Sequence, residues 1–520
     1  MQILDLYPLK GFFHPHEPLD FWVQIKTKRS GSAVLRLSMY ALQVCHYETQ
    51  IHLTFNEGEQ AVPITLPEDI NLPCGGYALC AAYDGEEHWT AFDIQNKWLD
   101  FPRYGFLSDF SADLDDERAV TARMEALAKY HITGLQFYDW QYRHDQLVAP
   151  ADEYLDPLQR PLSLHTIRRL IASAHQANMA AMPYLAIYGA SIEFWRQHPD
   201  WGLYDQAGKP LLFEDFLGLM DPSDGSPWSA HLAQQCRRTL QSLHFDGLHI
   251  DQYGDPKQAF TESGAEIDLP QAFVDFINVR KAELDVPVLF NAVGNWPIEA
   301  LAKSKADFMY IEVWPPTPRF TDLRRIVEDA HRLSGGKAVV IPLYIPAAQK
   351  TNLLLADAVI TASGGTHLEL GDDLRLLSDP YFPKSESLDE PYLADLRRYW
   401  DFIVANQVVL GPQAETPDME PVLPQGVYGI VRRNGNLLAL HLIQITSEDC
   451  WTEPQLPRNC LLDVPVSLAV GDAVKQILWA SPDLPAWQWQ PLAFTWQDGK
   501  LSCRLPSLTH WSSILIEIDA

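Results

Sequence analysis

Two carboxylates at the ends of apolar segments are the residues of this sequence best suited to chemistry. Asp251 ends the run Gly247-Leu-His-Ile-Asp251, and Glu312 ends the run Phe308-Met-Tyr-Ile-Glu312. An ionised carboxylate in a buried strand costs several kcal/mol of desolvation free energy unless it is paired. Two such strands in one chain therefore indicate acid/base or nucleophilic catalysis at the carboxyl end of a sheet.

The neighbours of the two carboxylates predict different protonation states. His249 and Tyr253 are polar and would keep Asp251 ionised, whereas the apolar and aromatic segment 310–314 would raise the pKa of Glu312 and keep it protonated. A carboxylate beside a carboxylic acid is what glycoside cleavage requires. We interpret Asp251 as the nucleophile and Glu312 as the acid/base, although periodicity alone does not decide the assignment.

The stretch around both residues alternates strand-like and helical patterns. Eight apolar runs predict strands: Tyr104–Phe110, Gly134–Trp140, Ala180–Tyr188, Gly247–Gln252, Val288–Val293, Phe308–Trp314, Ala338–Ile345 and Thr366–Leu370. Helical patterns between them cover Glu117–Tyr130, Leu164–Asn178, Ser229–Leu243, Gln271–Leu284, Asp322–Leu333 and Asn352–Ser363. The strands lack polar alternation, as expected when both sheet faces are covered. Eight strand–helix units predict a (β/α)8 TIM barrel.

The two ends of the chain have a different pattern, with short alternating runs such as Leu19–Ile25 and Ser512–Ile518 separated by turn residues. A chain of 520 residues is too long for one core. We predict a multidomain α/β plus all-β protein: an N-terminal immunoglobulin-like β-sandwich over residues 1–100, a catalytic barrel over 101–410 and a C-terminal antiparallel β-sandwich over 411–520. The long stretch from Ser191 to Trp228 is predicted to be a functional loop.

Active sites of such barrels lie at the carboxyl ends of the strands. Carboxylates and aromatic residues dominate the predicted rim, and they suit a carbohydrate because aromatic faces stack on sugar rings while polar groups bind hydroxyls. The candidate substrate-binding residues are Tyr138, Asp139, Trp140, Tyr142, His144, Tyr188, His249, Tyr253, Asp255, Asn291, Trp314, Glu369 and Asp372.

Several of these candidates also have a purely structural interpretation. His249 can be a packed core histidine, Trp314 can belong to the barrel interior, and Glu369 and Asp372 can cap the last helix. His249 and Asp251 could also ligate a metal, but few other histidines fall at strand ends. We therefore predict no catalytic metal and no cofactor, and an acidic loop at Asp372 leaves only a structural calcium conceivable.

The composition limits the partners. The net charge of −29 and the pI near 4.9 disfavour nucleic acid and anionic membranes, whereas a neutral substrate fits. No apolar run reaches the ~18 residues of a membrane span. The segment Met1–Lys10 lacks the features of a secretory signal, and the seven cysteines contain no C-x-x-C pair. These features predict a cytoplasmic protein of undefined oligomeric state, although a processed secreted chain would look the same.

Four segments resemble glycoside hydrolase family 66, the family of dextranases and cycloisomaltooligosaccharide glucanotransferases. They are Tyr130–His144, Phe245–Asp255, Asn291–Gly294 and Tyr310–Trp314. The resemblance implies a retaining mechanism on α-1,6-linked glucan, through a covalent glucosyl intermediate. Within it, Asp251 matches the nucleophile and Glu312 matches the acid/base. The sandwich–barrel–sandwich order is also that of the family.

The leading functional hypothesis is thus a retaining hydrolase of the α-1,6 linkages in dextran or isomaltooligosaccharides. Family transferases carry a carbohydrate-binding insertion in the barrel, and this sequence has no room for one, which favours hydrolysis. The alternatives are a transglycosylase that forms (cyclo)isomaltooligosaccharides and a non-catalytic glucan-binding barrel. The presence of both carboxylates argues against the last. A retaining mechanism predicts carboxyl groups about 5–5.5 Å apart.

Overall fold

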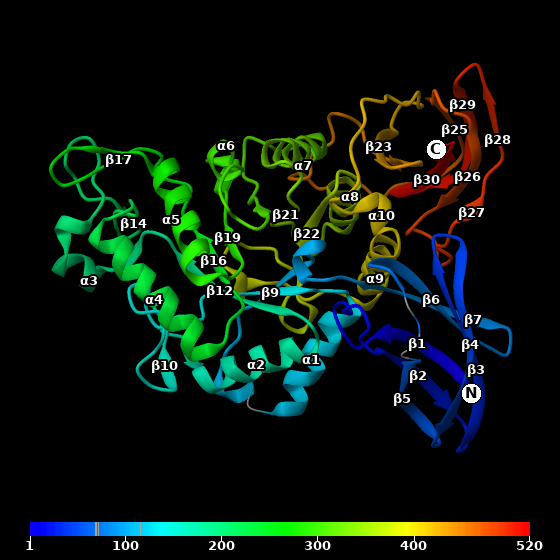
Figure 1. The fold of residues 1–520 in the computed structure, drawn as a ribbon, viewed down its shortest axis with the longest axis horizontal. Coiled ribbons are helices and arrows are strands. Elements are labelled where there is room, and N and C mark those ends of the chain that lie inside the picture. The colour runs from blue at the N-terminus through cyan, green and yellow to red at the C-terminus, as the bar shows by residue number, and fades with distance from the viewer. Residues whose placement is uncertain (68–69, 71, 115, 520) are drawn as a thin grey trace.

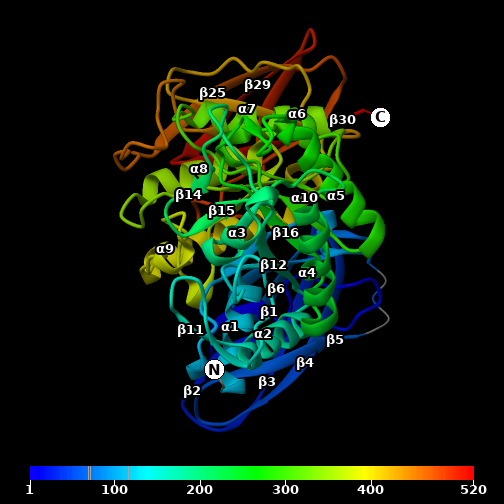
Figure 2. The ribbon, with the colours of Figure 1, turned by 90° about the vertical axis from the view of Figure 1, so that its left-hand side faces the viewer.

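A mixed α/β body forms the centre of the molecule, and antiparallel strands from the two ends of the chain lie beside it (Figure 1). The computed structural model describes residues 1–67, 70, 72–114 and 116–519. Viewed from the side, the N-terminal strands lie below this body and the C-terminal strands above it (Figure 2). None of the helices in these residues has both the length and the hydropathy of a membrane span.

The central body contains two parallel sheets. The larger has the order β19 (Val288–Phe290), β16 (Leu248–Asp251), β12 (Ala180–Ala186), β9 (Gly134–Phe137) and β8 (Tyr104–Leu107). The smaller has the order β20 (Met309–Tyr310), β21 (Val339–Pro342) and β22 (Gly365–Leu368). Seven of the eight strands lie within the predicted segments, and β22 begins at Gly365, one residue before the predicted start at Thr366.

Single parallel bridges, Asn291–Tyr310 and Phe106–Gly371, link the two sheets at both ends. The prediction of one continuous eight-stranded barrel sheet is therefore not confirmed. Between β19 and β20 the pairing is limited to one bridge because both strands are short, with three and two residues. What the structure shows is a parallel α/β body made of these two sheets, which we call its two arcs.

Helices cover these arcs. They are α1 (Glu117–Lys129), α2 (Leu164–Gln176), α4 (Pro227–Leu243), α5 (Leu269–Leu284), α7 (Phe320–Ser334), α8 (Lys350–Ala362) and α9 (Glu390–Ala405). The first six begin and end within two residues of their predicted limits. Local sequence explains the starts: the Ser163 side chain accepts the Thr166 N–H at the start of α2, as an N-cap residue does.

Each end of the chain forms two antiparallel sheets over an apolar core, as predicted. The N-terminal sheets are β1 (Gln2–Pro8), β2 (Leu19–Thr27) and β5 (Gly58–Leu66), and β4 (Val44–Phe55), β3 (Gly31–Ala41), β6 (Gly75–Tyr83) and β7 (Glu86–Ile94). The C-terminal sheets are β23 (Tyr428–Asn434), β24 (Leu437–Ile443), β30 (Trp511–Ile518), β26 (Val474–Ala480) and β27 (Gln490–Pro491), and β25 (Leu461–Ala469), β29 (Lys500–Leu508) and β28 (Phe494–Gln497). The domain limits at residues 100 and 410 remain predictions.

A buried ion pair ties the N-terminal strands to the central body. Arg103, just before β8, is fully buried and donates to both carboxylate oxygens of Asp93 on β7, at 2.8 and 2.9 Å. The same guanidinium donates to the Gly11 carbonyl at 2.9 Å. Nearby, Asp401 on α9 accepts the Ala91 N–H at 2.8 Å. The first strand of the central body therefore depends on groups from the N-terminal sheets.

Candidate active site

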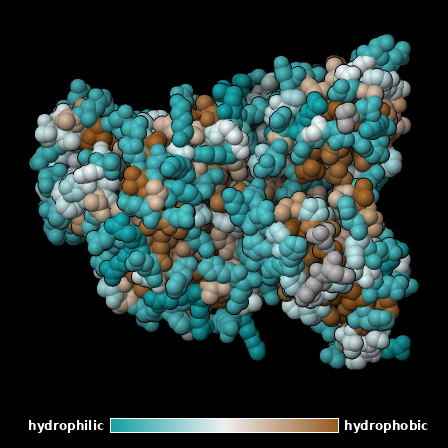
Figure 3. Space-filling model, in the orientation of Figure 1, coloured by the Kyte–Doolittle hydropathy of each residue, from teal (hydrophilic) through white to brown (hydrophobic). Residues whose placement is uncertain are grey.

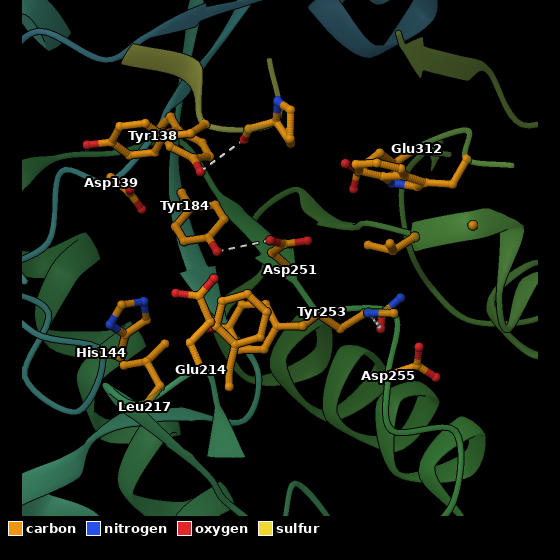
Figure 4. Close-up of a pocket in the computed structure, with 18 of the residues that line it drawn as sticks. Tyr138, Asp139, His144, Tyr184, Glu214, Leu217, Asp251, Tyr253, Asp255 and Glu312 are labelled. Atoms are coloured by element: carbon orange, nitrogen blue, oxygen red, sulfur yellow. Dashed lines mark hydrogen bonds between the residues drawn. The ribbon is translucent and has the colours of Figure 1, made fainter. Parts of the chain in front are cut away.

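A cavity of about 760 Å³ opens at the carboxyl ends of the parallel strands (Figure 4). This volume lies in the range of about 300–1,000 Å³ that is usual for small-molecule sites. Its walls contain carboxyl groups and aromatic rings. The polar and aromatic lining residues are Tyr138, Asp139, His144, Asp156, Tyr184, Phe213, Glu214, Phe216, Asp251, Gln252, Tyr253, Asp255, Lys257, Glu312, Trp314 and Tyr381.

Asp251 and Glu312 lie together in this cavity because one amide bridges them. The Asn291 side-chain nitrogen donates to Asp251 Oδ1 and to Glu312 Oε2, at 2.8 Å in both cases. The two oxygens therefore lie at most twice 2.8 Å, or about 5.6 Å, apart. Asp251 ends β16, and Asn291 and Glu312 follow β19 and β20, so three neighbouring strand ends build this arrangement.

Each carboxyl group also receives a tyrosine hydroxyl. Tyr184, on β12, donates to Asp251 Oδ2 at 2.9 Å, and Figure 4 shows this bond at the centre of the cavity. Tyr344, which follows β21, donates to Glu312 Oε1. The predicted contrast between a polar Asp251 site and an apolar Glu312 site is therefore wrong, because each carboxyl accepts one tyrosine hydroxyl and one Asn291 bond.

Burial raises the pKa of both carboxyl groups. The pKa of Asp251 rises to about 7, first because the group is desolvated and then because the negative charge of Glu312 lies close to it. Desolvation also raises the pKa of Glu312, against the lowering effect of the bonds from Tyr344 and Asn291. The two groups lie so close together that the negative charge of one opposes the ionisation of the other, and they titrate as a pair.

His249 and Tyr188 form hydrogen bonds with groups other than the Asp251 carboxylate. His249 is buried and bonds through Nδ1 to the Tyr104 hydroxyl at 3.2 Å, and burial lowers its pKa to about 3. It is therefore neutral and does not contact Asp251 in the predicted way. The Tyr188 hydroxyl accepts the Tyr253 N–H at 2.7 Å. Neither residue lines the cavity, so both position the segment 249–253 and do not reach a ligand.

Six of the other predicted substrate-binding residues line the cavity: Tyr138, Asp139, His144, Tyr253, Asp255 and Trp314. Tyr253 stacks on Phe213, with 4.2 Å between ring centroids, and Trp314 is 36% exposed. Burial lowers the pKa of His144 to about 4, so a neutral imidazole faces the cavity. Desolvation raises the pKa of Asp139 to about 6, and the Arg160 guanidinium opposes the rise.

Four predicted residues lie away from the cavity and correct the sequence analysis. Trp140 is fully buried and donates its indole N–H to the Tyr184 carbonyl at 3.0 Å. The Arg143 guanidinium lies over the Tyr142 ring, with its central carbon 4.1 Å from the ring centroid. Asp372 forms a buried ion pair with Arg123 at 2.9 Å and accepts the Ser108 N–H at 2.6 Å, so it is structural.

The fourth, Glu369, belongs to a buried cluster between β22 and the helices. His367 Nδ1 lies 2.6 Å from Asp357 Oδ1 and 3.7 Å from Glu369 Oε2, and Trp400 donates to Glu369 Oε1 at 3.2 Å. The potential ligand atoms of Asp357, His367 and Glu369 lie within 4.8 Å of one another, so they could hold a metal ion. None of the three lines the active-site cavity, and such an ion would not touch the substrate.

The sequence analysis did not assign several residues that line or support the cavity. Phe213, Glu214 and Phe216 come from the hairpin of β14 (Leu212–Phe213) and β15 (Leu217–Leu219), within the long loop that was predicted to be functional. Tyr184 and Tyr344 lie within the predicted strand segments Ala180–Tyr188 and Ala338–Ile345, and this position was the available signal. No sequence pattern within this hairpin indicated that its residues line the cavity.

A cavity with two bridged carboxyl groups and aromatic walls is typical of a glycoside-active enzyme, and the comparisons with known proteins place the chain in this class. The family model of glycosyl hydrolase family 66 matches residues 10–515. The chain therefore belongs to this family.

Two cycloisomaltooligosaccharide glucanotransferases of Niallia circulans are similar in sequence. One is 27% identical over 368 residues, which cover 65% of this chain and 38% of that enzyme. The other is 22% identical over an alignment 695 residues long, which includes 98% of this chain and 71% of that enzyme. The match to the first relative thus spans well under half of its length.

Solved structures share the fold. A cycloisomaltooligosaccharide glucanotransferase from Paenibacillus sp., in complex with cycloisomaltoheptaose, superposes with a TM-score of 0.91 at 20% identity and 99% coverage of both chains. A maltogenic α-amylase from Thermotoga neapolitana superposes with a TM-score of 0.53 at 14% identity, over 80% of this chain and 99% of the other. The first comparison extends over the central body and both sets of flanking strands.

Proposed function

We propose that this chain is a retaining glycoside hydrolase of α-1,6-glucosidic linkages in dextran or isomaltooligosaccharides. Asp251 acts as the nucleophile and Glu312 as the acid/base, and the two parallel arcs act together as a (β/α)8 barrel. The Asn291 bridge carries the proposal, because it limits the two carboxyl oxygens to about 5.6 Å. Retaining enzymes place these groups about 5–5.5 Å apart, whereas inverting enzymes leave about 6.5–9.5 Å for a water.

In the first step, Glu312 donates its proton to the glycosidic oxygen while the Asp251 carboxylate attacks the anomeric carbon. The bond from this carbon to the leaving oxygen breaks, and a glucosyl ester of Asp251 forms. In the second step, the Glu312 carboxylate takes a proton from water, whose oxygen attacks the same carbon and releases Asp251. The first step needs one proton on the pair, held by Glu312 while Asp251 is ionised.

Tyr184 and Asn291 position the nucleophile for this reaction. Both donate to Asp251, one to each carboxylate oxygen, at 2.9 and 2.8 Å. These bonds fix the plane of the carboxylate and lower its pKa against the effect of burial. Tyr344 has the corresponding role at Glu312 and holds its carboxyl group beside the leaving oxygen.

Transfer to a sugar hydroxyl is a second candidate function. The two Niallia circulans relatives and the Paenibacillus structure are all glucanotransferases by name. Phe213, Phe216, Tyr253 and Trp314 also give the cavity aromatic walls, which can hold an acceptor sugar and shield the intermediate from water. Water and an acceptor hydroxyl would compete for the same glucosyl ester.

Product analysis tests both functions. The purified protein is incubated with dextran, an isomaltooligosaccharide series and soluble starch, beside Asp251→Asn and the control Asp224→Asn, which changes an exposed carboxylate. We expect cleavage of the α-1,6 substrates alone, unchanged in the control and lost in Asp251→Asn. Products longer than the substrate, or cyclic ones, would indicate transfer. Cleavage of starch alone, or an active Asp251→Asn protein, would contradict the proposal.

A further inference from the structure

A second cavity, of about 360 Å³, lies where the N-terminal strands, the end of α9 and the C-terminal segment before β27 come together. It shares no lining residue with the active-site cavity. Figure 3 shows the surface hollowed between the N-terminal and C-terminal lobes, on the side away from the α3 and β17 loops. This cavity is also within the size range of small-molecule sites.

Four aromatic side chains form much of its wall: Tyr40, Trp89, Trp487 and Trp489. Trp487 and Trp489 are almost fully buried, and the Trp489 indole donates to Asn406 Oδ1 at 2.5 Å, so these two rings are held in place. Tyr40 and Trp89 are only half-buried, with 5.4 Å between their ring centroids. The wall therefore offers aromatic surface that is backed by rigid rings.

Polar groups stand beside these rings. Gln488 lines the cavity, and its amide nitrogen is shielded from solvent without a hydrogen-bond partner among the described residues. Gln43 is exposed and donates to the Trp489 carbonyl at 3.0 Å, which leaves its own amide oxygen as an acceptor. The Gln43 amide oxygen can accept a hydrogen bond from a ligand hydroxyl, whereas the Gln488 nitrogen would need a side-chain rotation to donate to one.

Aromatic faces beside amide and carboxylate groups match the chemistry of a neutral sugar. A purely apolar ligand would leave Gln43, Gln488 and Glu87 facing it, and a polyanion would be repelled by the net charge of −29. We propose that this cavity is a secondary site that binds a segment of α-1,6-glucan chain outside the active site. The proposal rests on the proposed function for the identity of the glucan.

A secondary site has a consequence that depends on the length of the ligand. A long dextran chain can occupy both cavities, and the second contact is then intramolecular and gains from a high effective concentration. We expect a trisaccharide to occupy only one of the two sites at a time. The site should therefore raise affinity for polymer and leave affinity for short oligosaccharides unchanged.

Binding measurements in the Asp251→Asn background test this without turnover. Trp89→Ala removes a half-buried ring of the cavity, and Trp496→Ala is the control, a 38% exposed tryptophan on β28 outside the cavity. Affinity for dextran, isomaltotriose and soluble starch is measured by calorimetry. We expect Trp89→Ala to weaken dextran binding by about tenfold or more, with isomaltotriose unchanged and Trp496→Ala without effect.

Equal dextran affinity in Trp89→Ala, an equal loss for dextran and isomaltotriose, or a preference of the site for starch would each overturn the proposal. If Trp89→Ala lowers the melting temperature strongly, Gln43→Ala replaces it, since that side chain is exposed. In the active protein, Trp89→Ala should raise KM for dextran and leave kcat unchanged. A failure of the proposed function is distinguishable, because it appears as no cleavage of dextran by the protein without substitutions.

Discussion

Replacing Asn291 by alanine should shift the whole pH–activity profile to higher pH. The side-chain amide donates one hydrogen bond to Asp251 and one to Glu312, both at 2.8 Å. A donor stabilises the ionised form of a carboxyl group, so its loss raises the pKa of both groups. Most single substitutions near a catalytic pair would move one limb of the profile, whereas this one should move both in the same direction.

The size of the shift follows from the strength of such bonds. A hydrogen bond to a charged group contributes about 1.5–3 kcal/mol, and one pKa unit corresponds to about 1.36 kcal/mol, so each pKa should rise by roughly 1–2 units. Burial has already raised the pKa of Asp251 to about 7. At a pH below the acid limb, kcat/KM should therefore fall by about 10- to 100-fold.

The assay is kcat/KM on an isomaltooligosaccharide between pH 4 and 10, with melting temperatures measured beside it. Asn352→Ala is the matched control, because Asn352 is also buried but donates to the Trp451 and Glu453 carbonyls outside the active-site cavity. It should lower stability without moving either limb. Limbs that stay in place in Asn291→Ala, or that move in opposite directions, would refute the shared-donor reasoning.

Three further substitutions give distinct outcomes. Glu312→Gln removes the negative charge that helps raise the pKa of Asp251, so labelling of Asp251 by an activated fluoroglucoside should extend to lower pH; an unmoved acid limit contradicts the coupling. Tyr344→Phe removes a donor from Glu312 and should raise its pKa, which moves the alkaline limb of kcat/KM upward, and an unchanged alkaline limb would exclude this role. Asp93→Asn leaves Arg103 buried without its partner and should lower the free energy of unfolding in urea by about 3–5 kcal/mol.

The control for the last experiment is Asp463→Asn, which breaks the exposed pair between Asp463 and Arg504. Exposed pairs are screened by solvent and contribute little, so this protein should unfold close to the wild-type urea concentration. Equal losses of unfolding free energy in the two variants would mean that burial does not determine how much the Arg103–Asp93 pair contributes to stability.

Element positions could be predicted because the central body is buried on both sheet faces and most of its helices bury one face, although α8 is buried on all sides. Strand ends then placed Asp251, Asn291 and Glu312 at one edge, since parallel strands end on the same side. Strand ends do not define where the chain turns next. Asp139 has a φ of 52°, in the left-handed region, and after it Trp140 lies in the core instead of the rim.

Other errors have different physical causes. His367 and Glu369 lie two residues apart and meet in the cluster with Asp357 outside the cavity, while Leu368 between them joins the core that contains Tyr104 and Phe106. Because successive side chains of a strand point to opposite faces, the sequence spacing alone places His367 and Glu369 on the face opposite Leu368. The hairpin that carries Phe213 and Glu214 is different, because its place over the cavity depends on contacts far apart in the sequence, and no local period encodes them.

The Arg103–Asp93 pair has a consequence for how this fold can be divided. A chain that starts near residue 101 would contain Arg103 but would lack both Asp93 and the Gly11 carbonyl that accept its hydrogen bonds. We therefore expect the N-terminal strands to unfold together with the central body, so that recombination could not exchange them freely. Shortened relatives that keep the catalytic strands should keep these strands too, or should carry an apolar residue in place of Arg103.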